Sequence, residues 1–401
     1  MVFTTDISQI SLPHRLWRQL PVDGRRRALG MVSWALAPKP DAVAPARQAG
    51  IAVAGEFSRI CGLSEAARLT LAGLRDLGQA PRAVEISWRG PGLGNLNLPP
   101  GVPLIVHVNA PDMPLALLRL GREAARNRRI IGAWAWELPD PDPAWAVGVR
   151  YVHEIWAPSR FAADALEKIA PGRVRVVTPP VAIAPPMPAV LDRAAFGLPA
   201  AALVVLTAFD LASSFTRKNP LAAVAAFRAA FGDDPTRILV LKLGNPGHFP
   251  ADFATIRAAV ATAKNIRLET RTMPAAEHFA LMACADIVLS LHRSEGFGLV
   301  LAEAMLLGIP VIATGWSGNL DFMDAASAML IRPRLVPAID PRGVYAVPGA
   351  LWAQPSLGEA TAALRHLAGD GAARRALGAR GRAMAVARLG TASLAAALAG
   401  L

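Results

Sequence analysis

The chain has 401 residues, of which 53% are hydrophobic and 18% charged, and its formal net charge is +12. This composition supplies enough apolar surface for folded cores and excludes a disordered chain, while the length exceeds the roughly 250 residues that one core usually serves. Two cysteines, Cys61 and Cys284, are too few for a disulfide framework or a structural zinc site, so a reducing, cytoplasmic compartment is expected.

The positive charge predicts an anionic partner, which the charge alone does not identify. Nucleotide phosphates, nucleic acid and an acidic membrane surface would all be attracted. The arginines are spread over many predicted helices and no nucleic-acid-binding module is present, so no nucleic acid partner is expected. The longest apolar run near the start, residues 28–37, is about half of what a bilayer-crossing helix needs, and we expect neither a transmembrane helix nor a secretion signal.

The first half of the chain alternates between two patterns. Residues 1–48 are interpreted as a basic extension, either poorly ordered or lying on a membrane or on the second domain. From residue 49 to residue 185, short apolar runs alternate with segments of helical period, which predicts a parallel sheet covered by helices. Strands are expected at 51–55, 103–109, 129–136, 153–159 and 173–180, and helices at 65–77, 114–127 and 160–169.

A proline-rich segment, residues 186–200, is predicted to link this domain to a second one of the same kind over residues 201–375. Strands are expected there at 202–210, 237–243, 265–270, 286–291 and 310–314, and helices at 220–231, 253–263, 276–284 and 298–307. Residues 376–401 are predicted to be helical and could pack back over the first domain. The fold class is therefore α/β, with two Rossmann-like domains facing a central cleft.

The most informative stretch is residues 294–318, SEGFGLVLAEAMLLGIPVIATGWSG. It places Glu295 after a buried strand, where ligands bind in open parallel sheets. Gly296 and Gly298 allow the backbone to approach a ligand, and the free N–H groups of the following helix favour phosphate or developing negative charge. The backbone that we expect to hold sugar and phosphate oxygens belongs to Gly296, Phe297, Gly298, Leu299 and Val300.

Glu303 follows Glu295 by eight positions, about one turn into the predicted helix. A carboxylate there can accept hydrogen bonds from vicinal ribose hydroxyls while Glu295 contacts the sugar. Alternatively, both glutamates are ordinary carboxylates that stabilise a helix dipole.

The segment resembles the E-x7-E signature of GT-B glycosyltransferases of family 4, written EGFGL, an EAM-type helix and GxPVIA. That resemblance implies a retaining enzyme that moves a hexose from a nucleotide-diphosphate sugar, a co-substrate rather than a cofactor, to a glycan or lipid-linked acceptor. It also implies that Glu295 faces hydroxyls of the donor sugar and that Glu303 binds the ribose. The matching residues are Glu295, Gly296, Phe297, Gly298, Leu299, Glu303, Ala304, Met305, Gly308, Pro310, Val311, Ile312 and Ala313.

Two further loops resemble the family's donor-binding loops. Lys218 matches the position of a lysine that binds the donor diphosphate, and Arg217 precedes it; such cations stabilise a departing phosphate. Many members have an arginine where this chain has Phe209, so the grip on the diphosphate differs. Gly62 and Leu63 resemble a first-domain loop that approaches the same group, although the residues around them are also compatible with simple helix capping.

On the acceptor side, His107 lies near the end of the predicted strand 103–109, and Glu137 comes at the end of the predicted strand 129–136. We expect Glu137 to orient or deprotonate the acceptor, or to pair with an arginine, and His107 to be either an acceptor-site or a core histidine. No convincingly placed DxD pair is present, which predicts transfer without a metal.

Three hypotheses about function follow. The first is an active enzyme that works at or near the inner face of an anionic membrane, and the second is a silent nucleotide-sugar-binding subunit of a polysaccharide assembly. The third is a dinucleotide-dependent oxidoreductase, which the lack of a G-x-G-x-x-G motif disfavours.

Overall fold

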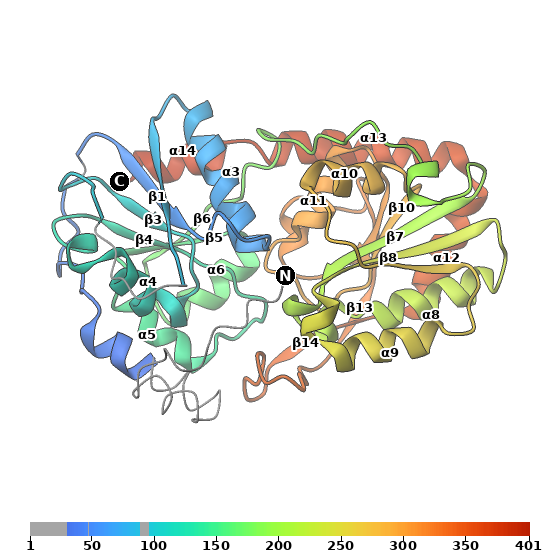
Figure 1. Cartoon of the computed structure of the whole chain (residues 1–401), viewed down its shortest axis with the longest axis horizontal. Helices are drawn as coiled ribbons and strands as arrows, with labels where there is room; N and C mark the ends of the chain where they lie inside the picture. Colours follow the sequence, from blue (N-terminus) through green and yellow to red (C-terminus); the bar gives the residue numbers. More distant parts are fainter. Residues whose placement is uncertain (1–29, 47, 89–95) are drawn as a thin grey trace, which may run out of the picture.

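The computed structural model describes residues 30–46, 48–88 and 96–401, so most of the predicted N-terminal extension lies outside the described residues. Two sheet domains lie side by side (Figure 1). The first is a parallel six-stranded sheet with the order β2-β1-β3-β4-β5-β6. Its strands are β1 Ile51–Gly55, β2 Pro81–Glu85, β3 Leu104–Val106, β4 Ile130–Ala133, β5 Glu154–Ala157 and β6 Val174–Val176, and its helices are α3 Gly62–Asp76, α4 Met113–Leu120, α5 Ala146–Val149 and α6 Arg160–Glu167.

The second domain is another parallel six-stranded sheet, with the order β12-β11-β10-β7-β8-β9. The order turns back at β7 and β10, which pair with each other, and such switch points are where open α/β sheets bind ligands. The strands are β7 Leu203–Asp210, β8 Arg237–Gly244, β9 Ile266–Glu269, β10 Ile287–Ser290, β11 Val311–Thr314 and β12 Met329–Ile331. The helices are α7 Phe215–Lys218, α8 Pro220–Phe231, α9 Pro250–Val260, α10 Ala275–Ala283, α11 Leu299–Leu306 and α12 Leu357–Gly369.

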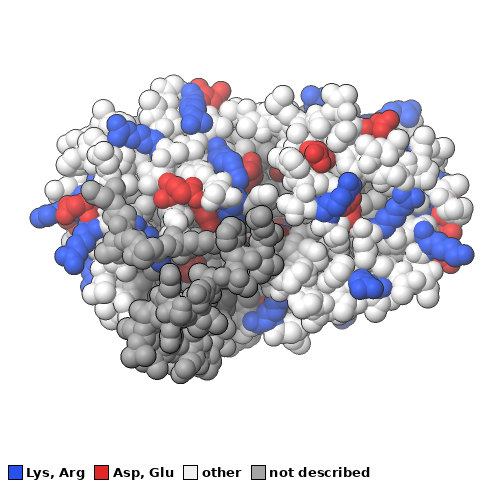
Figure 2. Space-filling model, in the orientation of Figure 1, with Lys and Arg blue, Asp and Glu red and all other residues white. Residues whose placement is uncertain are grey.

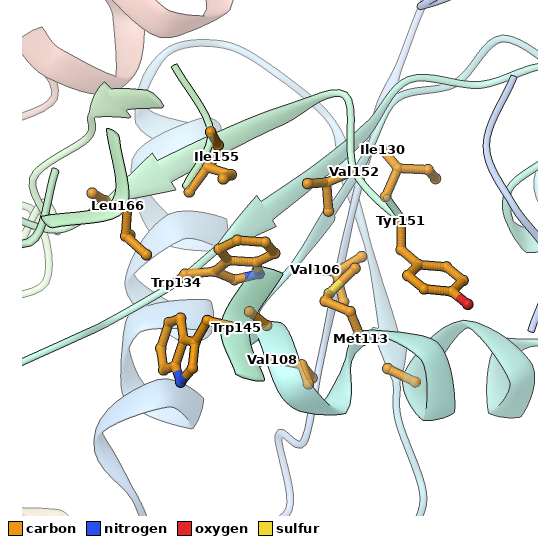
Figure 3. Close-up of a cluster of buried hydrophobic side chains, with 14 of the residues drawn as sticks. Val106, Val108, Met113, Ile130, Trp134, Trp145, Tyr151, Val152, Ile155 and Leu166 are labelled. Carbon is orange, nitrogen blue, oxygen red and sulfur yellow. The ribbon is translucent and has the colours of Figure 1, made fainter. Parts of the chain in front are cut away.

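The inner strands of both sheets are buried on two faces, as their nearly unbroken apolar runs predict. In β1 every residue is buried, and β10 and β11 are buried almost throughout. One core of the first domain contains a set of aromatic rings, with Trp134 packed edge-on against Trp145 at a centroid distance of 6.1 Å (Figure 3). The predicted architecture of two Rossmann-like parallel sheets is thus confirmed, while the domain boundaries at 49–185 and 201–375 stay predictions.

Several predicted elements are too long: the strands expected at 103–109, 153–159 and 173–180 span only Leu104–Val106, Glu154–Ala157 and Val174–Val176. The strand expected at 129–136 ends at Ala133, and the chain continues in an irregular segment towards the second domain. The helix expected at 114–127 ends at Leu120, because Gly121 has φ of 106° and breaks the helical backbone; a short 3₁₀ turn, Arg122–Ala124, follows it.

The C-terminal end of the chain returns to the first domain. The long helix α13, Gly371–Arg388, packs on α11, and α14, Ala392–Ala399, then lies beside α3 (Figure 1). Leu394 and Leu398 of α14 belong to the same buried cluster as Leu71 and Leu74 of α3. Helix α14 therefore completes the core on one side of the first domain, together with α3.

An antiparallel hairpin, β13 Pro333–Pro337 and β14 Leu351–Pro355, stands apart from both sheets. It follows β12 in the chain and lies between the two domains (Figure 1). Among the residues that the structure describes, no helix is both long and apolar enough to span a membrane.

Candidate active site

The loop after β10 carries Glu295 and is fixed by the loop after β11. The Glu295 backbone N–H donates to the Ser317 Oγ at 2.9 Å, and the Gly318 N–H donates to the Glu295 carbonyl at 2.9 Å. A Cβ atom on Gly318 would lie 2.3 Å from the Gly296 carbonyl oxygen, so only glycine permits this approach. The two loops thus set the backbone of Glu295 from both sides.

The Glu295 carboxylate faces two cations from α7. Its Oε2 lies 3.1 Å from Nη1 of Arg217, and its Oε1 accepts a hydrogen bond from the Lys218 ammonium. Burial alone would raise the pKa of Glu295, but Lys218 and Arg217 outweigh it and lower that pKa to about 2. Glu295 is therefore ionised at every pH at which the protein is expected to work.

Arg217 and Lys218 differ in what they offer to a ligand. Arg217 is 3% exposed, and its guanidinium donates to the carbonyls of Ser294 (2.7 Å) and Ser213 (2.9 Å). Lys218 keeps a side-chain exposure of 17% and contacts only Glu295 among the ion pairs of the described residues. Burial lowers the pKa of Lys218 in spite of Glu295. Arg217 is thus built into the scaffold, and Lys218 is the cation that a phosphate could reach.

Two helix N-termini lie opposite each other beside this ion cluster. Gly298, with φ of 102°, forms the N-cap of α11, and Gly62 is the first residue of α3. A Cβ on Gly62 would be 3.9 Å from the Leu299 Cδ1, which places the first turns of the two helices in contact. The free backbone N–H groups of both turns favour an anion between the domains.

The Phe297 side chain is turned into the core, with its ring 5.0 Å from that of Phe322, and Val300 is partly buried in the first turn of α11.

Glu303 lies on α11 and is partly buried. Burial and the neighbouring carboxylate of Glu65 on α3 raise the pKa of Glu303 to about 8. No hydrogen bond or ion pair to the Glu303 carboxylate occurs within the described part of the chain. Glu303 is therefore a carboxyl group whose ionised form would be stabilised by a hydroxyl-rich ligand.

Glu137 comes from the first domain and reaches this cluster across the domain boundary. Its carbonyl accepts a hydrogen bond from the Ser294 hydroxyl, and its carboxylate lies 3.8 Å from Nη2 of Arg217. The hydroxyl of Tyr345 donates to the Glu137 Oε2 at 3.1 Å. Burial raises the pKa of Glu137, although Arg217 opposes the shift. A partly buried carboxylate with a raised pKa is suited to accept a proton.

His107 lies at the end of β3 in the first domain. It is 7% exposed, and burial lowers its pKa to about 3, so the imidazole is neutral. Its Nε2 has no hydrogen-bond partner within the described residues, and no contact there joins it to Glu137 or Glu295. Such a low pKa makes His107 a weak proton acceptor.

Sequence reasoning missed two contributors to this site. Tyr345 reaches Glu137 from the β13–β14 hairpin, and no local pattern marks it. His292 is buried and hydrogen-bonded to Ser290 (3.0 Å) and Asn319 (3.2 Å), and it braces the turn before Glu295. A histidine three positions before the motif's glutamate, at the end of a buried strand, was a signal that could have been used. In the described ranges no three His, Cys, Asp or Glu side chains converge as metal ligands would.

The sequence matches a known protein family and a curated relative. The family model described as "GT4-conflict: Family 4 Glycosyltransferase in conflict systems" matches residues 172–387, more than half of the chain. A D-inositol 3-phosphate glycosyltransferase from Jonesia denitrificans is 32% identical over 167 residues, which are 39% of this chain and 38% of that relative. The aligned part is thus well under half the length of that curated relative.

Solved structures share the fold at low sequence identity. The Anabaena protein HepE in complex with UDP and glucose has a TM-score of 0.59 at 14% identity, over 88% of this chain and 100% of that one. A glycosyltransferase from Rickettsia africae ESF-5 has a TM-score of 0.62 at 11% identity, over 88% and 97%. Sucrose-phosphate synthase from Thermosynechococcus elongatus has a TM-score of 0.61 at 16% identity, over 88% and 98%.

Proposed function

We propose, from the premise that this chain belongs to the family 4 glycosyltransferases and has their GT-B fold, that it moves a hexose with retention from a nucleotide-diphosphate sugar to a glycan or lipid-linked acceptor. Transfer of a sugar from a nucleotide sugar is the activity of the family. The observation that carries the finer proposal is the cluster in which Glu295, Lys218 and two helix N-termini surround one place between the domains. The structural relative HepE was solved with UDP and with UDP-glucose, which supports a uridine donor as the first candidate.

Each part of the donor has a matching group in this cluster. The ionised Glu295 would accept hydrogen bonds from hydroxyls of the transferred sugar, and Glu303 from the ribose hydroxyls. The diphosphate would lie between the first turns of α3 and α11, where backbone N–H groups and the Lys218 ammonium stabilise the charge that grows as the glycosidic bond breaks. Arg217 would serve chiefly to keep Glu295 ionised and in place.

Glu137 would act on the acceptor. A Cβ on Gly296 would be 3.1 Å from the Trp136 carbonyl oxygen, so the segment bearing Glu137 lies against the glycine next to Glu295. With its raised pKa, Glu137 can orient the attacking hydroxyl or take its proton as the hydroxyl oxygen forms the new bond to the anomeric carbon. The nucleotide diphosphate departs from the same face, and its oxygens are an alternative acceptor for that proton.

The replacement Glu295→Gln tests the proposal, because the amide keeps the size of the side chain and loses its charge. We expect transfer to fall by at least about 100-fold, as for other preorganised polar groups, while the affinity for the free nucleotide diphosphate stays within a few-fold. Isothermal titration and product detection across UDP-, GDP- and dTDP-sugars measure the two effects. Unchanged turnover in the variant refutes the role of Glu295, and a wild-type protein that binds a donor but transfers nothing favours the silent subunit.

We also propose that the transfer needs no metal ion, because the Lys218 ammonium and the backbone N–H donors of two helix N-termini would face the diphosphate. Turnover of the wild-type enzyme in excess chelator should equal turnover without chelator. A loss that magnesium or manganese restores would refute this part of the proposal.

A peripheral contact with an anionic membrane would bring the enzyme to a lipid-linked acceptor. The helix at 30–36 exposes Met31 (67%), Trp34 (45%) and Leu36 (65%), a combination suited to the headgroup region. On the face that Figure 2 shows, basic and acidic side chains are interspersed. Attraction to an anionic membrane would therefore come from a limited part of the surface and not from the whole face. Sedimentation with acidic vesicles should exceed that with neutral ones and should drop in Trp34→Ser; equal sedimentation refutes the contact.

A further inference from the structure

The base of the β13–β14 hairpin is tied to the donor domain two residues before Glu295. The Ala353 N–H donates to the Arg293 carbonyl at 2.9 Å, and the Arg293 guanidinium donates twice to the Gln354 Oε1, at 2.9 and 3.1 Å. The same guanidinium reaches the Thr216 carbonyl at 2.7 Å and lies 5.5 Å from the centre of the Trp352 ring. One arginine thus connects the hairpin, α7 and the loop that bears Glu295.

The connection between the two strands is held to the donor domain a second time. The Asp340 carboxylate accepts hydrogen bonds from the backbone N–H groups of Val344 (2.9 Å) and Tyr345 (3.3 Å). Arg342 stacks on Phe249 at 3.9 Å, pairs with Asp252 of α9 and donates to the Leu211 carbonyl at 2.5 Å. The conformation of the connection is therefore fixed over the residues that lead into Tyr345.

The inner face of the hairpin is buried in the other domain. Tyr345 and Trp352 are 4% and 2% exposed and belong to the same apolar cluster as Trp136 and Trp145 of the first domain. The Tyr345 ring lies 5.6 Å from that of Trp136, and the Trp352 ring 6.4 Å from that of Tyr345. The hairpin is covalently part of the donor domain, but its apolar side chains complete the acceptor domain's core.

Tyr345 places a hydroxyl inside the transfer site. Its O–H donates to the Glu137 Oε2 at 3.1 Å across 208 residues of sequence, and the Arg217 guanidinium lies 5.8 Å from the centre of its ring. Burial raises the pKa of the Tyr345 phenol, so the phenol keeps its proton and remains a donor. Glu137 therefore meets a neutral donor on one oxygen and a cation near the other.

We propose that this hairpin is an interdomain clasp and that Tyr345 is a positioning residue, which holds the Glu137 carboxylate in the orientation that the acceptor needs. This inference rests on the role of Glu137 in the proposed function. If the two domains moved apart about a hinge, the aromatic cluster would have to come apart. The clasp therefore keeps the acceptor-binding and donor-binding groups in a fixed arrangement relative to each other. The positioning role depends on the hydrogen bond from Tyr345 to Glu137 and not on the packing of the Tyr345 ring alone.

The replacement Tyr345→Phe removes the hydroxyl and keeps the ring. The Tyr345 hydrogen bond stabilises the ionised form of Glu137, as do Arg217 and Lys218, whereas Glu295 opposes it. Losing the bond should therefore raise the pKa of Glu137, which ¹³C NMR titration of the glutamate carboxyls measures, with Glu137→Gln providing the assignment. In turnover, kcat should fall while KM for the donor is unchanged, and the limb of the pH profile that reports Glu137 should move to higher pH.

Val347→Ala is the matched control, because Val347 is buried in the same cluster and makes no contact with the carboxylate of Glu137 in the described structure. It should lower the melting temperature without moving the titration of Glu137. A titration of Glu137 that is the same in Tyr345→Phe and the wild type overturns the positioning role, whatever the turnover. Full turnover in Glu137→Gln instead overturns the proposed role of Glu137 in transfer, and the NMR titration still decides whether Tyr345 positions it.

Discussion

Lys218 and Glu295 form an ion pair at the boundary between the domains, with the ammonium of Lys218 donating to the Glu295 Oε1. Lys218 is the last residue of the short helix α7, and Glu295 lies in the loop after β10, 77 residues further along the chain. Both are mostly buried, so each lowers the cost of placing the other's charge out of water. A donor with a diphosphate and a hydroxyl-bearing sugar offers a partner to each member of the pair.

Replacing Lys218 by Met should remove the accessible cation of the phosphate site while keeping the apolar stem. We expect kcat to fall by about 100-fold or more, because charge that develops on the departing diphosphate then has one donor fewer. The affinity for the free nucleotide diphosphate should weaken as well. Steady-state kinetics with the preferred donor measures the loss, and Lys264→Met, at an exposed lysine, is the control. Equal kinetics in both variants would contradict the assignment of Lys218.

Glu303 should make donor binding depend on pH. With its pKa raised to about 8, the unliganded carboxyl is largely protonated at neutral pH, whereas ribose hydroxyls would stabilise the carboxylate. Binding should then release a proton, and affinity should rise with pH up to about 8, by as much as about tenfold per unit, and level off above it. Titration calorimetry in buffers of different ionisation enthalpy counts the protons released.

A nucleotide sugar is the right probe for that experiment, because its diphosphate does not titrate near neutral pH. In Glu303→Gln the proton release and the pH dependence should both disappear. Without a ligand, the stability of the wild type should decrease as pH rises from 4.5 towards 8, since the folded state binds this proton more tightly than the unfolded state. Proton release that persists in Glu303→Gln would assign it to another group.

The parts of the site that could be predicted from the sequence are those whose contacting residues lie close together along the chain. The loop with Glu295, the glycines and Glu303 is contiguous, so its residue pattern alone located it after a buried strand. The approach of Gly318 to Gly296 lies in the same stretch. The bond from Tyr345 to Glu137 joins a hairpin to another domain, and no periodicity reports such a contact.

Two of the strands that were not predicted from the sequence, β2 and β13, have a common physical cause. The edge strand β2 is partly exposed and starts with Pro81, and β13 begins and ends with prolines and packs on no large sheet. Neither has the buried apolar run that marks the inner strands. Arg217 shows the limit for site residues: the pattern placed it beside Lys218, but only its three-dimensional contacts distinguish a buried scaffold arginine from a free phosphate ligand.

Gly318→Ala should disturb the loop that sets Glu295. The added Cβ would be 2.3 Å from the Gly296 carbonyl oxygen, a backbone atom, so the two loops must separate. Overpacking of this kind costs about 1–3 kcal/mol in free energy of unfolding, and displacement of Glu295 should also lower kcat. Gly369→Ala is the control, because a Cβ there meets nothing within 4 Å and the residue lies in α12. If chemical denaturation gave the same free energy of unfolding for both variants and kinetics gave the same kcat, the close approach of Gly318 to Gly296 would not be needed.

The returning helix α14 should stabilise the first domain in particular. Leu394 is 1% exposed, and its Cδ2 lies 3.0 Å from where a Cβ on Gly73 of α3 would be, so the helices are in close contact. Leu394→Ala should cost about 2–5 kcal/mol, as for other buried leucines, whereas Leu357→Ala, at a residue 42% exposed in α12, should cost much less. Hydrogen exchange locates the effect: protection should fall in β1 and α3, whose residues share a buried cluster with Leu394, and stay the same in β7 and β8. An equal loss of protection in both sheets would mean that the two domains unfold as one cooperative unit, and an unchanged β1 would show that α14 contributes little to that core.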